Sequence, residues 1–211
     1  DIIVSDLHPD FHTTRYAQRS GLRFLQVQHH FAHILAPMLE HGVPPGKKVL
    51  GVCLDGYGYG DDGSAWGGEF LICDYGDYQR FAHFKYIPLP GGDLASRQPW
   101  RMALAYLYDV FGDKIPRSGP LMTVDERQKA GVIEMIRRKM NSPLSSSCGR
   151  LFDAVSFLAG LGPIKAEFEA EAPMRLESAA DPQISTAYKF RITGRDSCRI
   201  IDFRPTIEAV F

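Results

Sequence analysis

The sequence lacks a charge excess and a long apolar run. Its 24 Lys and Arg residues balance 25 Asp and Glu residues, so the net charge is -1 and no basic surface for a nucleic acid or an anionic membrane is expected. No apolar stretch reaches the ~18 residues that cross a bilayer, and the first residues do not form a signal peptide. These absences predict a cytoplasmic protein that binds neither nucleic acid nor membrane.

Cysteine is also scarce. The four cysteines are far apart and form no C-x-x-C pair: Cys53, Cys73, Cys148 and Cys198. This spacing argues against a thiolate zinc site and against a disulfide framework, so free thiols are expected. The hydrophobic fraction of 45% and the charged fraction of 23% instead indicate an ordinary globular protein with a substantial core.

The apolar pattern predicts an α/β fold. Buried strand patterns at 1–5, 24–28 and 47–56 alternate with helical patterns, which is typical of layered α/β proteins. The later pattern predicts a pair of strands at 69–76 and 78–87. Three helices follow at 94–111, 125–140 and 145–162, and a terminal hairpin is expected from strands at 187–192 and 197–203. A boundary near residue 92 would divide an α/β half, roughly 1–92, from a mostly helical half with a terminal hairpin, roughly 93–211.

Three of the seven histidines are concentrated in VQHHFAHI. His29 and His33 have the i, i+4 spacing that places two side chains on one helix face, whereas His30 points elsewhere. They stand where a strand gives way to a helix, the edge of an α/β sheet at which ligands bind. Imidazole binds zinc and iron alike, and His30 replaces the glutamate that a zinc protease would need. Histidines that are packed or solvated without a ligand remain the alternative.

Asp55 ends the strand pattern at 47–56, which places its carboxylate at the same sheet edge. A glycine-rich loop follows at 57–68, and Gly56, Gly58 and Gly60 would let the backbone adopt positive φ and approach a ligand closely. No helix pattern follows, so this is not a dinucleotide fingerprint, but a phosphate-binding nest is compatible with it. A cation beside Asp55 would relieve its repulsion of a phosphate. An ordinary glycine-rich turn is the alternative.

The segment SSSCGRLFDAV predicts a second ligand contact. Gly149 near the start of a helix costs about 1 kcal/mol relative to alanine, so it indicates the close approach of another group. Arg150 would neutralise a phosphate, and Asp153, one turn later, would accept a hydrogen bond from a ribose hydroxyl. A capped amphipathic helix with an Arg–Asp pair on its surface is the alternative.

Five segments resemble one family, in the same order: DLHPDFHTTRYA, VQHHFAHI, GVCLDGYGYGDDGSAWGGEFL, KYIPLPGGDLASRQPWRMALAYL and SSCGRLFDAVSFLAGL. They resemble the C-terminal domain of the HypF family, the carbamoyltransferases of nickel–iron hydrogenase maturation, from about residue 5 to the end. The resemblance implies an α/β fold of the actin-like and sugar-kinase type, with a mixed sheet flanked by helices. This fold is similar to that of the enzyme that transfers threonylcarbamoyl groups to tRNA.

The resemblance also implies a reaction and a set of site residues. Family members convert carbamoyl phosphate and ATP into carbamoyl-adenylate and pass the carbamoyl group to the C-terminal cysteine of HypE, for the cyanide ligands of the hydrogenase iron. On the family pattern, His29, His33 and Asp55 match ligands of a divalent metal, iron or zinc. The residues that match segments near the phosphates, the carbamoyl group and the nucleoside are Asp55, Gly56, Gly58, Gly60, Gly149, Arg150 and Asp153.

The chain departs from the family pattern in what it lacks. It contains no acylphosphatase-like segment, paired C-x-x-C zinc site or YrdC-like adenylating module, and no S-G-G motif with a late aspartate ligand. We therefore expect the central part of the transfer domain, with an incomplete metal shell and no turnover alone. An O-carbamoyltransferase that acts on a small alcohol is the alternative function, followed by a docking module in which the metal only holds the fold.

Overall fold

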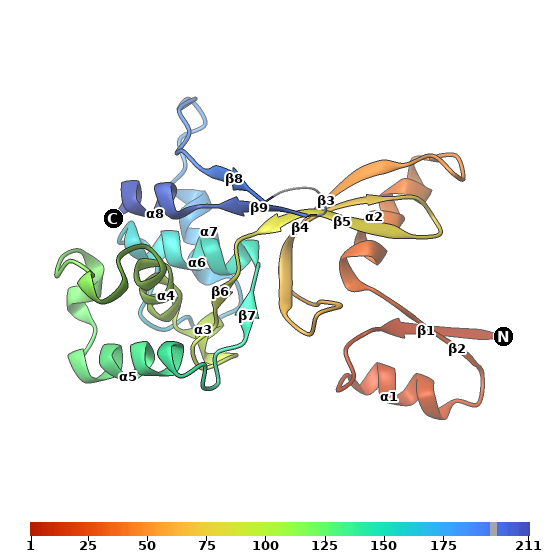
Figure 1. Ribbon diagram of the computed structural model, residues 1–211, viewed down its shortest axis with the longest axis horizontal. Helices are drawn as coiled ribbons and strands as arrows, with labels where there is room; N and C mark the ends of the chain where they lie inside the picture. The colour runs from red at the N-terminus through yellow and green to blue at the C-terminus, as the bar shows by residue number, and fades with distance from the viewer. Residues whose placement is uncertain (195–197) are drawn as a thin grey trace.

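Strand and helix alternate at the N-terminal end of the chain, as the apolar pattern predicts. The computed structural model describes residues 1–194 and 198–211 and begins with β1 (Ile2–Asp6), α1 (His12–Arg19), β2 (Arg23–Val27), α2 (His29–Glu40) and β3 (Val49–Tyr59) (Figure 1). Strands β1 and β2 pair in parallel, so α1 forms the crossover between them. Gln28 follows β2 directly and caps α2, because its side chain accepts a hydrogen bond from the Phe31 amide.

Strand β3 is longer and less buried than the sequence predicts. It continues to Tyr59 and pairs with β4 (Ala65–Cys73) in an antiparallel hairpin, so the predicted loop at 57–68 is a short turn between two strands. Its alternate side chains Leu50 and Val52 are 55% and 53% exposed. The other face of β3 lies against α2, and only that face is buried as the apolar pattern predicts.

In the described part of the chain, seven strands form one mixed sheet across the centre of the molecule (Figure 1). Besides β3 and β4 it contains β5 (Tyr78–Phe84), β6 (Ile87–Pro88), β7 (Leu144–Ser145), β8 (Arg191–Thr193) and β9 (Arg199–Asp202). The order is β6-β7-β4-β5-β9-β8, with β3 beside β4; the pairs β4–β7 and β5–β9 are parallel. The hairpin β8–β9 thus joins the sheet of the N-terminal half, and its turn falls largely outside the described residues. The division near residue 92 stays a prediction.

Helices dominate the second half of the chain. They are α3 (Leu94–Arg97), α4 (Pro99–Phe111), the 3-10 helices η1 (Gly112–Lys114) and η2 (Pro120–Thr123), α5 (Glu126–Arg137), α6 (Cys148–Leu158), α7 (Glu171–Ser178) and α8 (Arg204–Val210). The single helix predicted at 94–111 breaks at Gln98, because Pro99 disfavours helical angles in the residue before it. Asp125 and Ser147 cap α5 and α6 through side-chain oxygens that accept backbone amide hydrogens.

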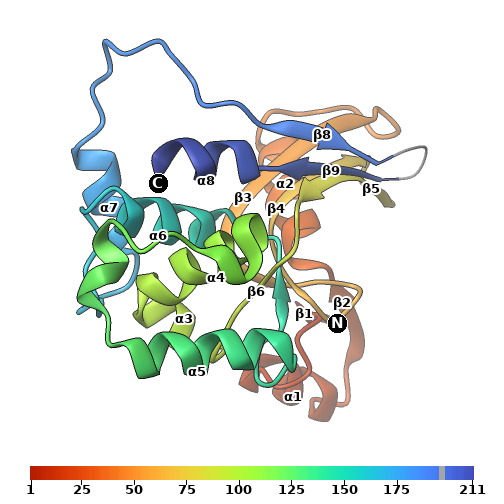
Figure 2. The ribbon, with the colours of Figure 1, turned by 60° about the vertical axis from the view of Figure 1, so that its left-hand side comes forward.

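Two apolar clusters hold these layers together. The larger cluster joins α4, α5, α6 and α8 to the end of the sheet and includes the buried Trp100 and Phe157; Figure 2 shows these helices beside the sheet. The smaller cluster joins α2 to β3 and β4 through Phe31, Ile34 and Leu71. The four cysteines are free thiols, and no helix in the described part of the chain has the length and apolar character of a membrane span.

Candidate metal centre

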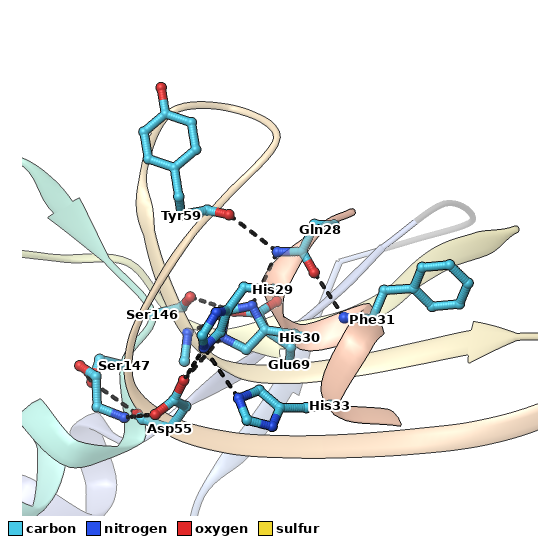
Figure 3. A network of polar contacts seen from close by, with 12 residues as sticks. Gln28, His29, His30, Phe31, His33, Asp55, Tyr59, Glu69, Ser146 and Ser147 are labelled. Carbon is cyan, nitrogen blue, oxygen red and sulfur yellow. Dashed lines mark hydrogen bonds and ion pairs between the residues drawn. The ribbon is translucent and has the colours of Figure 1, made fainter. Parts of the chain in front are cut away.

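Three elements place imidazole and carboxylate side chains at one point of the molecule. His29 and His33 lie one turn apart on α2, of which His29 is the first residue. Asp55 lies on β3, and Asp6 is the last residue of β1. Figure 3 shows that the side chains of His29, His33 and Asp55 point toward one another. The structure therefore brings together the three predicted ligands, although 26 positions separate His29 from Asp55.

These three side chains are close enough to bind one metal ion. One donor atom from each of His29, His33 and Asp55 lies within 4.8 Å of the others. The His29 Nε2 atom is 3.0 Å from Asp55 Oδ2 and 3.2 Å from His33 Nε2. Two imidazole nitrogens and one carboxylate oxygen form a donor set that suits both zinc and iron. The arrangement supports the metal interpretation over chance packing, and the role of ligand stays a prediction.

The hydrogen bonds of His29 determine which ring nitrogen faces the other two side chains. Asp6 Oδ2 is 2.8 Å from His29 Nδ1, so the carboxylate accepts the Nδ1 hydrogen. In the neutral ring this leaves a lone pair on Nε2, directed toward the Asp55 carboxylate and the His33 ring. Electron-rich groups repel one another at these distances unless a proton or a cation lies among them. A divalent ion satisfies all three, so the residues present fit a metal.

The sequence pattern does not single out Asp6 as part of this site. Asp6 reaches the site through the parallel pairing of β1 with β2. This pairing places Asp6 opposite Val27 and hence beside the start of α2. Asp6 Oδ1 also accepts a hydrogen bond from the His8 amide at 2.9 Å, so the carboxylate is held on both sides. A carboxylate behind a metal-binding histidine fixes the orientation of the ring and raises its basicity.

We expect Asp6→Asn to weaken metal binding by about 10- to 100-fold while all three ligands remain, because a neutral amide accepts the His29 Nδ1 hydrogen less well than a carboxylate does. Competition with a chelator, carried out on the full-length protein, measures the affinity. Asp10→Asn is the matched control, since Asp10 forms a surface ion pair with Arg15. Equal affinities in the wild type and Asp6→Asn would show that this carboxylate does not support the site.

The glycine-rich part of β3 differs from the prediction. The three glycines expected to have positive φ do not have it: Gly56, Gly58 and Gly60. The left-handed residue of this hairpin is Gly63, with φ of 75°. A Cβ at Gly58 would lie 2.7 Å from His29 Cδ2, and one at Gly60 would overlap the Trp66 indole. These two glycines therefore make room for aromatic rings, and contact between this segment and a phosphate stays a prediction.

Helix α6 begins against the backbone of β3. The Ser147 hydroxyl donates toward the carbonyl oxygens of Asp55 and Gly56, which are 3.1 and 2.8 Å away. The same hydroxyl oxygen accepts the Arg150 amide hydrogen as the helix cap. A Cβ at Gly149 would lie 3.0 Å from the Gly56 Cα, so glycine permits this close contact. The group that approaches Gly149 in the structure is thus the backbone of β3, the strand that carries Asp55.

Arg150 and Asp153 form an ion pair that is buried. The alternative that the sequence left open, an Arg–Asp pair on the helix surface, therefore does not describe it. Arg150 Nη1 is 2.8 Å from Asp153 Oδ2, and the side chains are 15% and 3% exposed. The contact lacks hydrogen-bond alignment, and Arg150 Nε has no partner within the described residues. Burial raises the pKa of Asp153 to about 6, although Arg150 opposes the rise. Unsatisfied donors in a buried pair suit a polar ligand, and the nucleoside role stays a prediction.

A buried polar network that the sequence pattern does not reveal lies behind the site. Glu69 is completely buried, and its carboxylate accepts hydrogen bonds from Arg80 Nε at 2.7 Å and from Ser146 Oγ at 2.5 Å. The Arg80 guanidinium stacks over Trp66 at 3.7 Å from the ring centroid. The network links β4, β5 and the segment before α6, and thereby holds the start of α6 next to the β3–β4 hairpin.

Comparison with protein families and relatives identifies similar proteins. Residues 51–211 match a family described as "Carbamoyltransferase, Kae1-like Domain, second subdomain", and residues 1–40 match the "HypF Kae1-like domain". The chain is 39% identical to a carbamoyltransferase HypF homolog of Cupriavidus necator, covering 99% of the chain and 54% of that relative. It is 38% identical to carbamoyltransferase HypF of Synechocystis sp., and the match covers 99% of the chain and 29% of that relative. The chain thus spans about half or less of the length of these relatives.

Solved structures of HypF proteins have the same fold. A full-length HypF in a phosphate- and nucleotide-bound form matches with a TM-score of 0.89 and 36% identity, covering 99% of this chain and 32% of that one. The HypF of T. kodakarensis matches with a TM-score of 0.82 and 33% identity, covering 99% and 28%. These matches confirm the predicted actin-like fold with a mixed sheet flanked by helices. The chain belongs to the HypF carbamoyltransferase family and comprises residues of its Kae1-like domain.

Proposed function

We propose that this chain provides the metal-binding transfer site of a carbamoyltransferase in nickel–iron hydrogenase maturation. In this proposal, carbamoyl phosphate and ATP supply the carbamoyl group as carbamoyl-adenylate, and the acceptor is the C-terminal cysteine of HypE. The observation that carries the proposal is the convergence of His29, His33 and Asp55 within 4.8 Å, in a chain that belongs to the HypF family.

The protein's part is to fix the positions of the ligands. A divalent ion, iron or zinc, held by His29, His33 and Asp55 would supply a Lewis acid for the carbamoyl oxygen or a charge that orients the adenylate. Asp6 holds the His29 ring from behind, and Ser147 holds the Asp55 carbonyl group. The site is therefore attached to β1, α2, β3 and α6, which are regular elements and restrict the movement of its side chains.

The transfer step needs no nucleophile from this chain. The acceptor thiol loses its proton to solvent, and the thiolate sulfur attacks the carbamoyl carbon. A C–S bond forms, the bond from that carbon to the adenylate phosphate oxygen breaks, and AMP leaves with the bonding electrons. Arg150 provides positive charge for the phosphate in this proposal, since its Nη2 atom would lie 4.0 Å from a Cβ added at Gly56, the residue after Asp55 on β3. Gly149 lets this part of α6 lie close to that strand.

Incubation of the full-length protein with ATP, radiolabelled carbamoyl phosphate and HypE tests the proposal. We expect label on HypE, with AMP and pyrophosphate formed from ATP and inorganic phosphate formed from carbamoyl phosphate. A HypE variant in which alanine replaces the C-terminal cysteine is the control and should remain unlabelled. Label on that variant would contradict the cysteine acceptor. Transfer only to a small-molecule alcohol would favour an O-carbamoyltransferase.

A further inference from the structure

His30 is the histidine of this helix that the predicted ligand set does not use. Its side chain is completely buried, and within the described residues its Nε2 atom has no hydrogen-bond partner. A buried donor without an acceptor costs about 1–3 kcal/mol, and most buried polar groups in folded proteins are paired. An unpaired nitrogen beside a candidate active centre therefore calls for a functional explanation.

Gln28 determines which nitrogen of His30 carries the hydrogen. Gln28 Oε1 accepts the Phe31 amide hydrogen at 2.9 Å, and this fixes the orientation of the side-chain amide. Gln28 Nε2 then donates to the Tyr59 carbonyl oxygen and to His30 Nδ1, each at 3.1 Å. Because Nδ1 is an acceptor, it has a lone pair, and the ring hydrogen lies on Nε2. The unpaired atom is thus a hydrogen-bond donor.

The Nε2–H group faces the metal-site side chains. His30 Nε2 is 3.9 Å from Asp55 Oδ2, and the His30 ring lies edge-on to the His29 ring with 5.2 Å between centroids. Figure 3 shows His30 next to His29 and Asp55. Gly58 covers the same nitrogen, since a Cβ at that position would be 2.9 Å from Nε2. A distance of 3.9 Å is too long for a hydrogen bond, so the donor is unpaired. Because Nε2 is itself buried, an incoming oxygen reaches it only when a neighbouring group moves, and the partly exposed Asp55 side chain is the one beside it.

We propose that His30 Nε2–H donates a hydrogen bond to an oxygen atom of the carbamoyl donor bound at His29, His33 and Asp55. The identity of the ligand rests on the proposed function. The direction of the donor is fixed in advance, because Gln28 holds the ring in place and the surrounding protein excludes water. A carbonyl or phosphate oxygen satisfies the Nε2–H group, whereas an N–H group at the same position would leave it unpaired.

Asp55 is the competing acceptor for this hydrogen. A shift of its carboxylate by about one ångström would bring Oδ2 within hydrogen-bond distance of His30 Nε2. His30 would then orient a metal ligand instead of binding the carbamoyl donor. The two roles make different predictions, because removal of the donor weakens metal retention in one case and ligand binding in the other.

The variants His30→Asn and His30→Gln separate the two ring nitrogens. The Asn amide reaches the position of Nδ1 and can accept the hydrogen bond from Gln28, but it places no group at the position of Nε2. The Gln amide nitrogen reaches the position of Nε2 and can donate there. A suitable probe is 5′-O-(N-carbamoylsulfamoyl)adenosine, a non-transferable analogue of carbamoyl-adenylate, titrated calorimetrically into the metal-loaded full-length protein.

We expect His30→Asn to bind the probe about tenfold more weakly than the wild type, and His30→Gln to recover most of the affinity. Elemental analysis should find unchanged metal content in both variants. Equal probe affinity of His30→Asn and the wild type, absence of probe binding by the wild type, or loss of metal from His30→Asn would overturn the inference. The titration contains no acceptor protein, so failure of transfer to HypE with this affinity pattern intact would reject the proposed function alone.

Discussion

Replacing both His29 and His33 by alanine is expected to abolish metal binding and to lower carbamoyl transfer by on the order of 10³-fold or more. The change removes two of the three donor atoms that lie within 4.8 Å of one another. Metal content is measured by elemental analysis, and transfer by the labelling of HypE. The fold should persist, because the His33 side chain is exposed and the His29 side chain is 27% exposed, so neither fills the core.

The double variant His12→Ala/His41→Ala is the matched control. It removes the same number of imidazoles from exposed positions outside the donor set, so metal content and transfer should equal those of the wild type. Full metal content in the His29/His33 variant would contradict the assignment of these ligands. Loss of metal with unchanged transfer would contradict a role of the metal in the reaction and would leave it a role in the fold.

Local spacing predicts part of this centre because part of it is local. His29 and His33 share a helix face whenever their segment is helical, since four residues make about one turn. Asp6 reaches the site through the pairing of β1 with β2, and Glu69 is satisfied by Arg80 and by a serine 77 positions away. These contacts depend on tertiary structure, so no pattern within a short window contains them.

The glycines of β3 illustrate a different limit. Glycine is compatible with a left-handed loop, and equally with an extended strand that has no room for a side chain. The local sequence does not distinguish the two, because the deciding contacts of Gly58 and Gly60 are with His30 and Trp66 on other segments. The same holds for Gly149, where the group that approaches is the backbone of Gly56.

Gly58→Ala is the smallest substitution that we expect to disturb the centre. Its Cβ would lie 2.7 Å from His29 Cδ2 and 2.9 Å from His30 Nε2, closer than nonbonded atoms approach. His30 is completely buried and held by Gln28, so the ring cannot move aside without disturbing its packing. We expect the free energy of unfolding to fall by about 1–3 kcal/mol, measured by denaturation of the metal-free protein. Metal binding should weaken as well, because His29 is displaced.

Two further variants show whether steric overlap with the imidazole is the cause. Gly131→Ala is the control, since this helical residue of α5 has no atom within 4 Å of an added Cβ, and alanine should stabilise the helix by up to about 1 kcal/mol. In a His30→Ala background, the ring that makes two of the three nearest contacts with the added Cβ is gone and only the contact with His29 Cδ2 remains, so the substitution should destabilise the protein less than in the wild type. An equal loss in both backgrounds would mean that overlap with the His30 imidazole is not the reason why this position requires glycine.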